Sequence, residues 1–387
     1  MKVHFIGNIC NNHYVLCKAL RKLGIDAHLF LTYFDLTHPF SQALPESEDP
    51  EIECDYPKWI HKISVPRWSP LFPFSLLELK RIAKCDLIHT HGNFAPYVMF
   101  LGVPYVIHPY GADLNIYPFF QVKFPKSLHP HYSLFRKLVG KSYKKASAVI
   151  LTVNPLWEQA IKVLLKNAKI VHIPLAIDTQ KFYYGYRKNF IFDNMFSNSN
   201  FFIFQTARHA WRKETIQKQG GDKGNDILIK AFAKVFKKNK NIKLILIEKG
   251  QDVLYSKALI EKLGISDGVR WLRPVKRFQL IKYLHSAHLF VDSLNTTIGS
   301  AALEAMCCGV PTVVNLPEEL KVMYEGEEPP VIQGESNVNN LAEKLEFLSE
   351  HLELLKEISV KQRQFIERHH SLEVVAIKLV KLYKSIP

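Results

Sequence analysis

The sequence lacks long apolar runs and is poor in cysteine, and these absences exclude several classes of protein. None of its uninterrupted apolar runs reaches the roughly 20 residues that a membrane-spanning helix needs. The six cysteines include an adjacent pair, Cys307 and Cys308, but no C-x-x-C pair, so neither a disulfide framework nor a zinc site is indicated. The opening residues MKVHFIGN reach glycine too early for a secretory signal. We therefore expect a reducing, cytoplasmic compartment.

Acidic residues are scarce beside the basic ones. The chain has 51 lysines and arginines against 36 aspartates and glutamates, a formal net charge of +15. Residues 121–145 contain seven basic residues, no acidic residue and three interleaved aromatic side chains, Tyr132, Phe135 and Tyr143. Such a balance favours an anionic partner, which could be nucleic acid, an acidic membrane face or a phosphorylated small molecule. A generally basic proteome or a solvated helix face would look the same.

The length and the apolar pattern predict two domains. At 387 residues the chain is too long for one ordinary hydrophobic core. The expected strands are residues 2–7, 26–33, 86–91, 104–110, 146–153 and 169–174, and then 200–207, 242–250, 268–274, 287–294 and 310–314. The expected helices include 11–23, 224–238, 254–263, 277–285 and 299–308. The fold class is therefore α/β, with two Rossmann-like parallel-sheet domains, a linker near 178–199 and only helices after residue 339.

Ligands of such sheets bind beyond the carboxyl ends of the strands, so we expect the site in the cleft between the two domains. The turn after the first strand, in FIGNICNNHY, contains Gly7 and Asn8. It lacks the G-x-G-x-x-G pattern, so a dinucleotide site is poorly supported. A glycine turn of this kind still allows a substrate to approach the backbone.

The stretch NTTIGSAALEAMCCGVPTVV, residues 295–314, opens a short helix near Gly299 or Ser300. The first turn of a helix has free backbone N–H groups and a partial positive charge, which together bind phosphate well. Glu304 lies about one turn further on, where a carboxylate can accept hydrogen bonds from a ribose diol. The alternative is a glutamate that is simply stabilised by the helix dipole.

A basic loop, within TARHAWRKETIQKQGGDKGND, follows the strand 200–207. Arg208 lies at the strand end and Lys223 at the start of the next helix. Two cations so placed can neutralise a diphosphate and stabilise it as a leaving group. The same residues could also form a solvated basic loop.

The segment HPYGADL places His108, Tyr110 and Asp113 at another strand end, where they could contact a sugar or relay a proton. A lone histidine in such a position is more often structural. The segment HTHG offers His89 and His91 on one strand face, but the sequence shows no third ligand near them, and we expect no metal site.

These segments, in this order, resemble the GT-B glycosyltransferases, specifically the retaining family 4. The resemblance extends over nearly the whole chain and includes RQFIERHHSLEVVAIKLVKLY at its end. It implies an N-terminal acceptor-side domain at 1–180, a nucleotide-sugar-binding domain at 181–365, and a last helix at 366–387 that packs back on the first domain. The segments that carry it are DLIHTHG, PYGADL, DKGNDILIKAFA and GSAALEAMCCGVPTVV.

The resemblance also implies roles for the residues singled out above. Glu304 would bind the ribose of a nucleotide-sugar donor, and Arg208 and Lys223 would hold the diphosphate and assist its departure. No divalent metal or other cofactor is expected. The remaining residues expected to line the donor or acceptor are Gly299, Ser300, Ala301, Thr296, Thr297, Gly7, Asn8, His108, Tyr110 and Asp113.

The chain departs from the family pattern in three places. Thr296 stands where the family has a second glutamate, and Tyr110 stands where it often has the histidine of an H-G-x-D sequence. The loop 209–222 is longer than usual and is expected to close over the donor. Either the donor sugar differs from the common hexoses, or catalysis relies more on the diphosphate itself.

The reaction implied is transfer of a sugar from a UDP- or GDP-sugar, with retention, to a glycan or lipid-linked acceptor. Residues 121–145 are expected to contact an anionic membrane from the cytoplasmic side. One alternative keeps the fold but makes the protein a sugar-nucleotide epimerase or a phosphorylase. Another is a basic nucleic-acid-binding protein, which would explain the charge but not the surroundings of Glu304.

Overall fold

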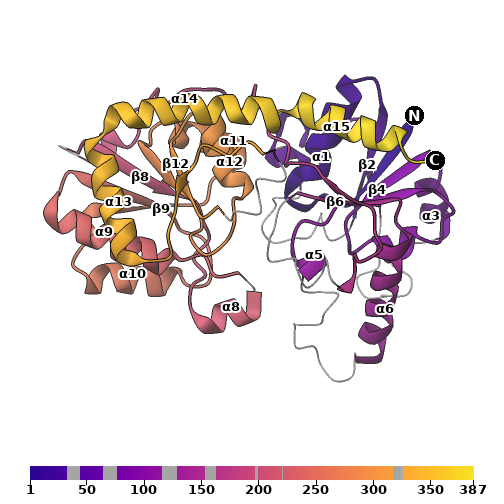
Figure 1. Ribbon diagram of the computed structural model, residues 1–387, viewed down its shortest axis with the longest axis horizontal. Coiled ribbons are helices and arrows are strands. Elements are labelled where there is room, and N and C mark those ends of the chain that lie inside the picture. Colours follow the sequence, from indigo (N-terminus) through magenta and orange to yellow (C-terminus); the bar gives the residue numbers. More distant parts are fainter. Residues whose placement is uncertain are drawn as a thin grey trace. The chain divides into compact units, whose positions relative to one another are not determined.

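The computed structural model divides into two compact units (Figure 1). Unit 1 is Met1–Ala176 together with Leu372–Pro387, and unit 2 is Ile177–Ser371. Residues 121–128 of the basic run, on which the membrane expectation rests in part, lie outside the described residues. The structure describes residues 1–32, 44–63, 76–115, 129–152, 163–196, 199–219, 221–316, 324 and 326–387.

Unit 1 is built on a seven-stranded sheet in which every strand pair is parallel. The strand order is β3-β2-β1-β4-β5-β6-β7, so the order reverses between β1 and β4. The carboxyl ends of those two strands therefore form the natural ligand edge of this sheet. The strands are β1 Lys2–Ile6, β2 Asp26–Leu31, β3 Ile60–Lys62, β4 Leu87–Thr90, β5 Tyr105–Ile107, β6 Ala148–Leu151 and β7 Ile170–His172.

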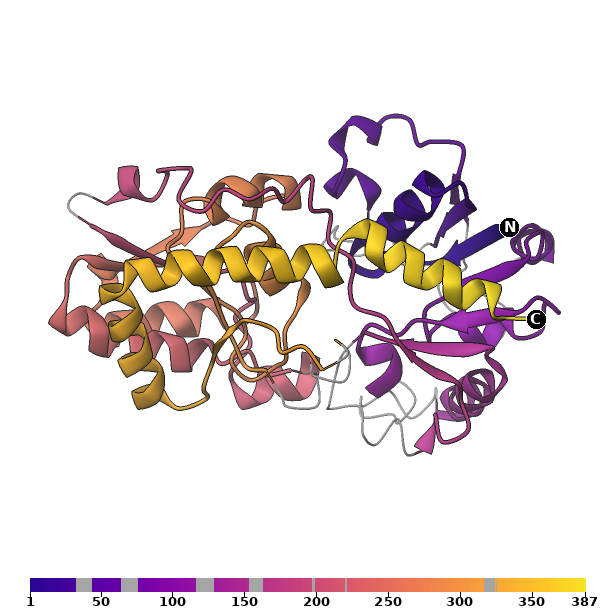
Figure 2. The same ribbon diagram turned by 45° about the horizontal axis from the view of Figure 1, so that its top comes forward.

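The helices of unit 1 include the last one of the chain. Val375, Leu379 and Tyr383 of α15 are buried in the same apolar cluster as residues of α1, and the two helices lie side by side in Figures 1 and 2. The expected return of the C-terminal helix to the first domain is confirmed. The helices are α1 Asn12–Lys22, α3 Leu76–Ile82, α4 Ala95–Val98, α5 Ala112–Asn115, α6 His129–Lys145 and α15 Leu372–Lys384.

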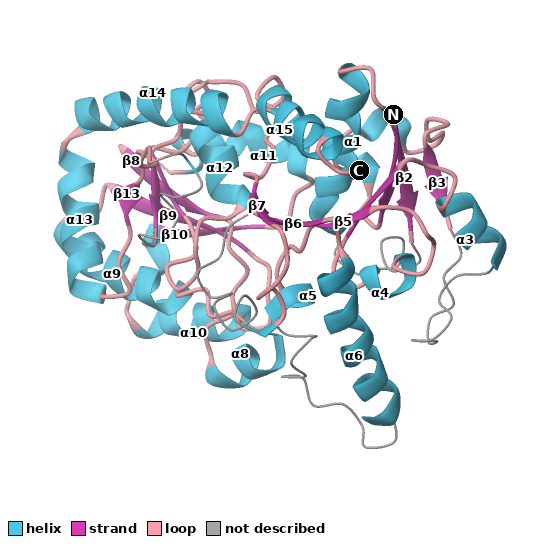
Figure 3. Ribbon diagram, turned by 45° about the vertical axis from the view of Figure 1, so that its right-hand side comes forward, coloured by secondary structure: helices cyan, strands magenta, loops and turns pink. Residues whose placement is uncertain are grey.

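Unit 2 repeats the same plan with six parallel strands in the order β10-β9-β8-β11-β12-β13. Its order reverses between β8 and β11. Strands are drawn in magenta in Figure 3. All residues of β8 are buried, as a strand covered on both faces requires. The strands are β8 Phe201–Gln205, β9 Ile242–Ile247, β10 Val269–Leu272, β11 Leu289–Val291, β12 Thr312–Val314 and β13 Ile332–Gln333.

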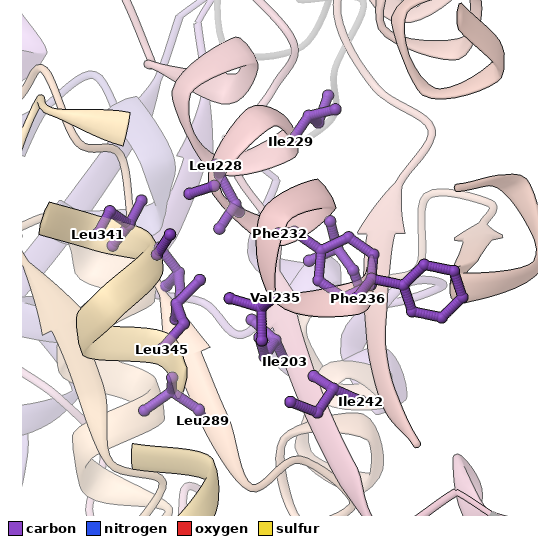
Figure 4. Packing of buried hydrophobic residues seen from close by; sticks show 14 of the residues in the cluster. Ile203, Leu228, Ile229, Phe232, Val235, Phe236, Ile242, Leu289, Leu341 and Leu345 are labelled. Carbon is purple, nitrogen blue, oxygen red and sulfur yellow. The ribbon is translucent and has the colours of Figure 1, made fainter. Parts of the chain in front are cut away.

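Helices α9 and α13 cover one side of this sheet. Leu228, Phe232 and Val235 of α9 pack with Leu341 and Leu345 of α13 in one fully buried cluster (Figure 4). The long α14 packs on α12. The helices are α8 Lys213–Gln219, α9 Asn225–Lys238, α10 Val253–Lys262, α11 Arg277–Leu284, α12 Ser300–Cys307, α13 Val338–Glu350 and α14 Leu352–His369.

The predicted α/β class and the two parallel sheets are confirmed, and each expected strand is present. Two short edge strands, β3 and β13, were not predicted. The stretch 178–199, expected to be a linker, contributes the fully buried Phe182 and Phe192 to unit 2. Among the described residues, no helix combines the length and apolarity needed to cross a bilayer.

Candidate functional site

In unit 2, the loop that contains Lys223 is joined to the segment that leads into α12. The backbone N–H of Leu294 donates to the carbonyl of Lys223 at 3.2 Å, and Asn295 Nδ2 donates to Asp222 Oδ2 at 2.8 Å. Gly224 has a φ of +63°, and a Cβ on it would lie 3.0 Å from Leu294 Cβ. The lysine is therefore fixed beside the approach to the helix, and glycine is needed at the next position.

A buried hydrogen-bond network of side-chain amides connects the segments that carry these loops. Asn225, the first residue of α9, accepts the N–H of Ala210 at 3.1 Å and donates to Gln205 Oε1 at 3.0 Å. Gln205 Nε2 in turn donates to the carbonyl of Asp292 at 3.3 Å. The network links the ends of β8 and β11, the two strands at which the sheet order reverses.

Asp292 follows β11 directly and was not among the residues predicted from sequence. Its buried carboxylate accepts the N–H of Gly299 at 3.2 Å, and burial raises its pKa while Lys223 opposes the rise. Burial lowers the pKa of Lys223, Asp292 counteracts this, and the nearby Arg208 lowers it further. Burial also lowers the pKa of Arg208. The structure thus brings Arg208, Lys223 and, through Asp292, the start of α12 into one electrostatic environment, and the binding of a diphosphate there stays a prediction.

The N-terminus of α12 has no side-chain cap. Gly299 precedes the helix and supplies no side chain to cap it, so its first-turn N–H groups need other partners. Thr297 Oγ1 is buried with no hydrogen-bond partner among the described residues. Thr296, Ser300 and Ala301 are partly exposed around the same turn. First-turn N–H groups and a helix dipole suit an anion here.

Glu304 is buried in α12, with 4% of its surface exposed. Its Oε1 accepts a hydrogen bond from Arg277 Nε at 2.8 Å and lies 2.5 Å from Arg277 Nη2. Arg277 begins α11, and its guanidinium lies 5.4 Å from the Phe182 ring centroid. Sequence analysis missed this ion pair because 27 residues separate the partners. The ribose-binding role of Glu304 stays a prediction.

In unit 1, the turn after β1 is tightly packed. Gly7 has a φ of +77°, and a Cβ there would lie 2.6 Å from His91 Cδ2. The buried Asn8 accepts the N–H of Tyr14 at 2.9 Å and donates to Asn11 Oδ1 at 2.7 Å. The turn is thus fixed by its own side chains, and the contact with a donor sugar stays a prediction.

Asp113 organises the loop after β5. Its carboxylate accepts the backbone N–H groups of Gly92 at 3.1 Å, Tyr110 at 3.0 Å and Gly111 at 3.0 Å. Burial raises its pKa to about 6, while these N–H groups act in the opposite direction. Three backbone contacts make it a loop-forming residue, and its catalytic role is untested.

His108 belongs to a cluster of buried histidines. Its Nδ1 lies 2.9 Å from the hydroxyl of Tyr110 and 3.0 Å from His89 Nε2. His13 of α1 stacks on His91, with ring centroids 4.3 Å apart. The sequence showed no third ligand beside His89 and His91, and the structure instead places the ligand atoms of His13, His89 and His108 within 4.8 Å of one another, a group that does not include His91. Those positions are distant in the sequence, so no local spacing revealed the group.

Two family models match the chain, one over each half. Residues 14–181 match Glycosyltransferase Family 4, and residues 217–365 match Glycosyl transferases group 1. A curated relative, the D-inositol 3-phosphate glycosyltransferase of Corynebacterium jeikeium (strain K411), is 26% identical over 176 residues. That match covers 43% of this chain and spans about two fifths, 41%, of the relative.

Solved structures share the whole fold at low sequence identity. A glycosyltransferase from Rickettsia africae ESF-5 has a TM-score of 0.68 at 17% identity, covering 100% of this chain and 98% of that one. Anabaena Alr3699/HepE, solved in complex with UDP, has a TM-score of 0.68 at 15% identity, covering 100% of both chains. With each half matched by a glycosyltransferase model and both sheets in the shared architecture, the chain belongs to the GT-B glycosyltransferases.

Proposed function

We propose that the protein is a retaining glycosyltransferase that moves a sugar from a nucleoside diphosphate sugar to a hydroxyl of a glycan or lipid-linked acceptor. The observation that carries the proposal is the joined pair of loops in unit 2. In these loops Lys223 lies close enough to Asp292 for the carboxylate to raise the pKa of the lysine. The same carboxylate accepts the N–H of Gly299, the residue that precedes α12. A diphosphate at this helix start would meet backbone N–H groups and two cations at once.

In the proposed reaction the bond between sugar and diphosphate loosens into an oxocarbenium-like state. Arg208 and Lys223 stabilise the charge that develops on the leaving diphosphate, which is worth several kcal/mol in a partly buried site. The departing diphosphate then takes the proton of the acceptor hydroxyl on the same face of the sugar, which retains the anomeric configuration. Since the chain supplies these two cations itself, we propose that the transfer needs no added divalent metal.

We propose UDP as the first nucleotide to examine, because the Anabaena structure of the same fold contains it. For the acceptor, the basic run 121–145 supports a lipid-linked glycan at an anionic membrane surface from the cytoplasmic side. Its described part, α6, ends with Lys144 and Lys145. Lysine-rich surfaces gain roughly 1 kcal/mol per residue near anionic lipid.

The test measures binding and product separately. Calorimetry with UDP, GDP and ADP should give micromolar affinity for one of them, together with a rise in Tm, since a ligand that binds only the folded state stabilises it. Mass spectrometry should then show transfer from the matching sugar nucleotide, unchanged by added Mg²⁺ or Mn²⁺. Binding of none of the three nucleotides would contradict the proposal.

The alternative functions give different products. An epimerase would convert the sugar nucleotide without an acceptor, and a phosphorylase would release a sugar phosphate. A nucleic-acid binder would show an affinity that falls steeply with salt, because phosphate contacts release counterions. Any one of these outcomes would contradict the transferase proposal and favour the corresponding alternative.

A further inference from the structure

Four histidines meet under the Gly7 turn of unit 1, and all four are buried. They come from α1, from β4 and the residue after it, and from the residue after β5. The ring centroids of His89 lie 4.9 Å from His13 and 5.1 Å from His108. Around a tetrahedral zinc ion with Zn–N bonds of about 2.0–2.1 Å, imidazole rings would lie at roughly this separation.

The hydrogen bonds fix where the proton of His13 lies. Its Nδ1 is 2.8 Å from the carbonyl of Gly7, which can only accept, so Nδ1 carries the proton. The Nε2 of a neutral ring is then a bare lone pair, and this atom is buried with no hydrogen-bond partner among the described residues. Buried polar atoms without partners are uncommon and call for a ligand or a water molecule.

Each ring nitrogen of His89 lies within hydrogen-bond distance of another side chain. Its Nδ1 lies 2.5 Å from the hydroxyl of Tyr383 on α15, and its Nε2 lies 3.0 Å from His108 Nδ1. A metal-bound histidine commonly has its second nitrogen bonded to an outer partner, which sets the tautomer. His91 differs, because its Nε2 accepts the N–H of Ile9 and its Nδ1 therefore carries the proton.

We propose that His13, His89 and His108 bind one Zn²⁺ ion, a structural site in unit 1 distinct from the diphosphate site of unit 2. Their ligand atoms already lie within 4.8 Å of one another, so short movements of the rings bring them to the distances that a tetrahedral ion requires. The Tyr110 hydroxyl, 2.9 Å from His108 Nδ1, offers an oxygen as the fourth ligand. Three imidazoles suit zinc better than magnesium or calcium, which prefer oxygen ligands.

The surroundings of the rings agree with this assignment. All three rings are buried, and the Nδ1 proton of His13 is directed to the carbonyl of Gly7, which leaves its Nε2 lone pair available for a metal ion. A bound ion would join α1, the end of β4 and the end of β5, and through Tyr383 it would also engage the last helix of the chain.

The experiment uses the full, tag-free chain, stripped with a chelator and titrated with ZnCl₂ against a chromophoric competitor. We expect one ion per chain, a rise in Tm on binding, and visible absorption typical of tetrahedral coordination when Co²⁺ replaces Zn²⁺. His13→Gln should abolish the stoichiometric binding. Because none of these readouts depends on sugar transfer, failure of the transferase proposal leaves this test intact.

Two further variants separate ligation from general damage to the fold. Tyr383→Phe keeps the packing but removes the outer hydrogen bond to His89, and it should weaken zinc affinity about 10–100-fold. His172→Gln alters an exposed histidine on β7 of the same unit and should bind as the wild type does. Absence of a 1:1 zinc complex in the wild type would overturn the proposal, as would wild-type affinity in a folded His13→Gln protein.

Discussion

The pKa of a lysine beside a buried carboxylate depends on burial and on the neighbouring charges more than the pKa of a surface lysine does. Lys223 is partly buried, and its pKa is lowered by desolvation and by Arg208 but supported by Asp292. A diphosphate brought to the start of α12 adds negative charge next to the ammonium and stabilises its protonated form. The residue is therefore suited to an anion whose charge grows during the reaction.

Replacement of Lys223 by alanine tests this role. We expect Lys223→Ala to reduce kcat/KM for sugar transfer by about 10²–10³, because one preorganised cation is worth about 3–4 kcal/mol in the transition state. The far-UV circular dichroism should be unchanged. Lys237→Ala, at an exposed position in the last turn of α9, is the matched control and should keep wild-type activity. Equal activity of the two variants would remove Lys223 from the mechanism.

Arg277 and Glu304 form an ion pair in which the carboxylate is buried and the guanidinium partly exposed. Arg277→Met removes the guanidinium that is paired with this carboxylate, which is 4% exposed, and we expect a loss of about 2–3 kcal/mol of unfolding free energy. Urea unfolding measures this loss. Arg273→Met, at an exposed position just before α11, should change stability by less than about 0.5 kcal/mol. If both variants unfold alike, the pair does not stabilise the unit.

At the scale of elements, the turn that opens α9 holds the site together. Alanine variants of two glycines separate the steric contact made at this turn from the cost of a left-handed backbone. Gly224 and Gly264 both have φ near +65°, at +63° and +68°. A Cβ at Gly264 would meet nothing within 4 Å, whereas a Cβ at Gly224 would meet Leu294 at 3.0 Å. Their alanine variants therefore share the backbone strain and differ in the contact.

We expect Gly264→Ala to lower the free energy of unfolding by about 1 kcal/mol, the usual cost of a left-handed backbone for alanine. Gly224→Ala should cost about 1–3 kcal/mol more, because Leu294 must move, and it should also weaken binding of the nucleoside diphosphate. Thermal unfolding and calorimetry measure the two effects. A Gly224→Ala protein with wild-type nucleotide affinity would show that the loop junction does not shape the site.

The elements that the sequence predicted well are those with a strong local signal. The strand 200–207 and the helix 224–238 were predicted from continuous apolar runs and from helical spacing, and both are present as β8 and α9. β3 and β13 were missed because these strands of two or three residues do not lie in a longer apolar run, whereas the equally short β7 lies in the run 169–174. The position of Lys223 just before a helix could be predicted because a glycine-rich loop precedes α9 there. The pairing of Arg277 with Glu304 and of His13 with His89 could not, because it depends on the tertiary fold. Asp292 had a usable signal, a polar residue directly after a buried strand.

At the scale of the whole molecule, neutral buried histidines make the fold sensitive to acid. In unit 2, burial lowers the pKa of His209 to about 4 and that of His288 to about 3, from an ordinary 6.5. His288 Nδ1 accepts the backbone N–H of Phe202 at 3.1 Å, a bond that requires an unprotonated nitrogen. As the pH falls below about 6.5, the unfolded chain binds protons that the folded chain does not, so stability falls until the folded pKa is reached.

We expect each of these two histidines to remove about 2 kcal/mol of unfolding free energy between neutral pH and about pH 5, since one pKa unit corresponds to about 1.4 kcal/mol. Urea unfolding followed by tryptophan fluorescence measures the change, because Trp211 and Trp271 lie in unit 2. His288→Asn retains an acceptor for the Phe202 N–H but does not titrate, so it should flatten the dependence of stability on pH. His351→Gln, at an exposed position, should leave the dependence unchanged. A wild-type slope in His288→Asn would show that this buried imidazole does not govern the acid response, and would assign the loss to other groups of the unit.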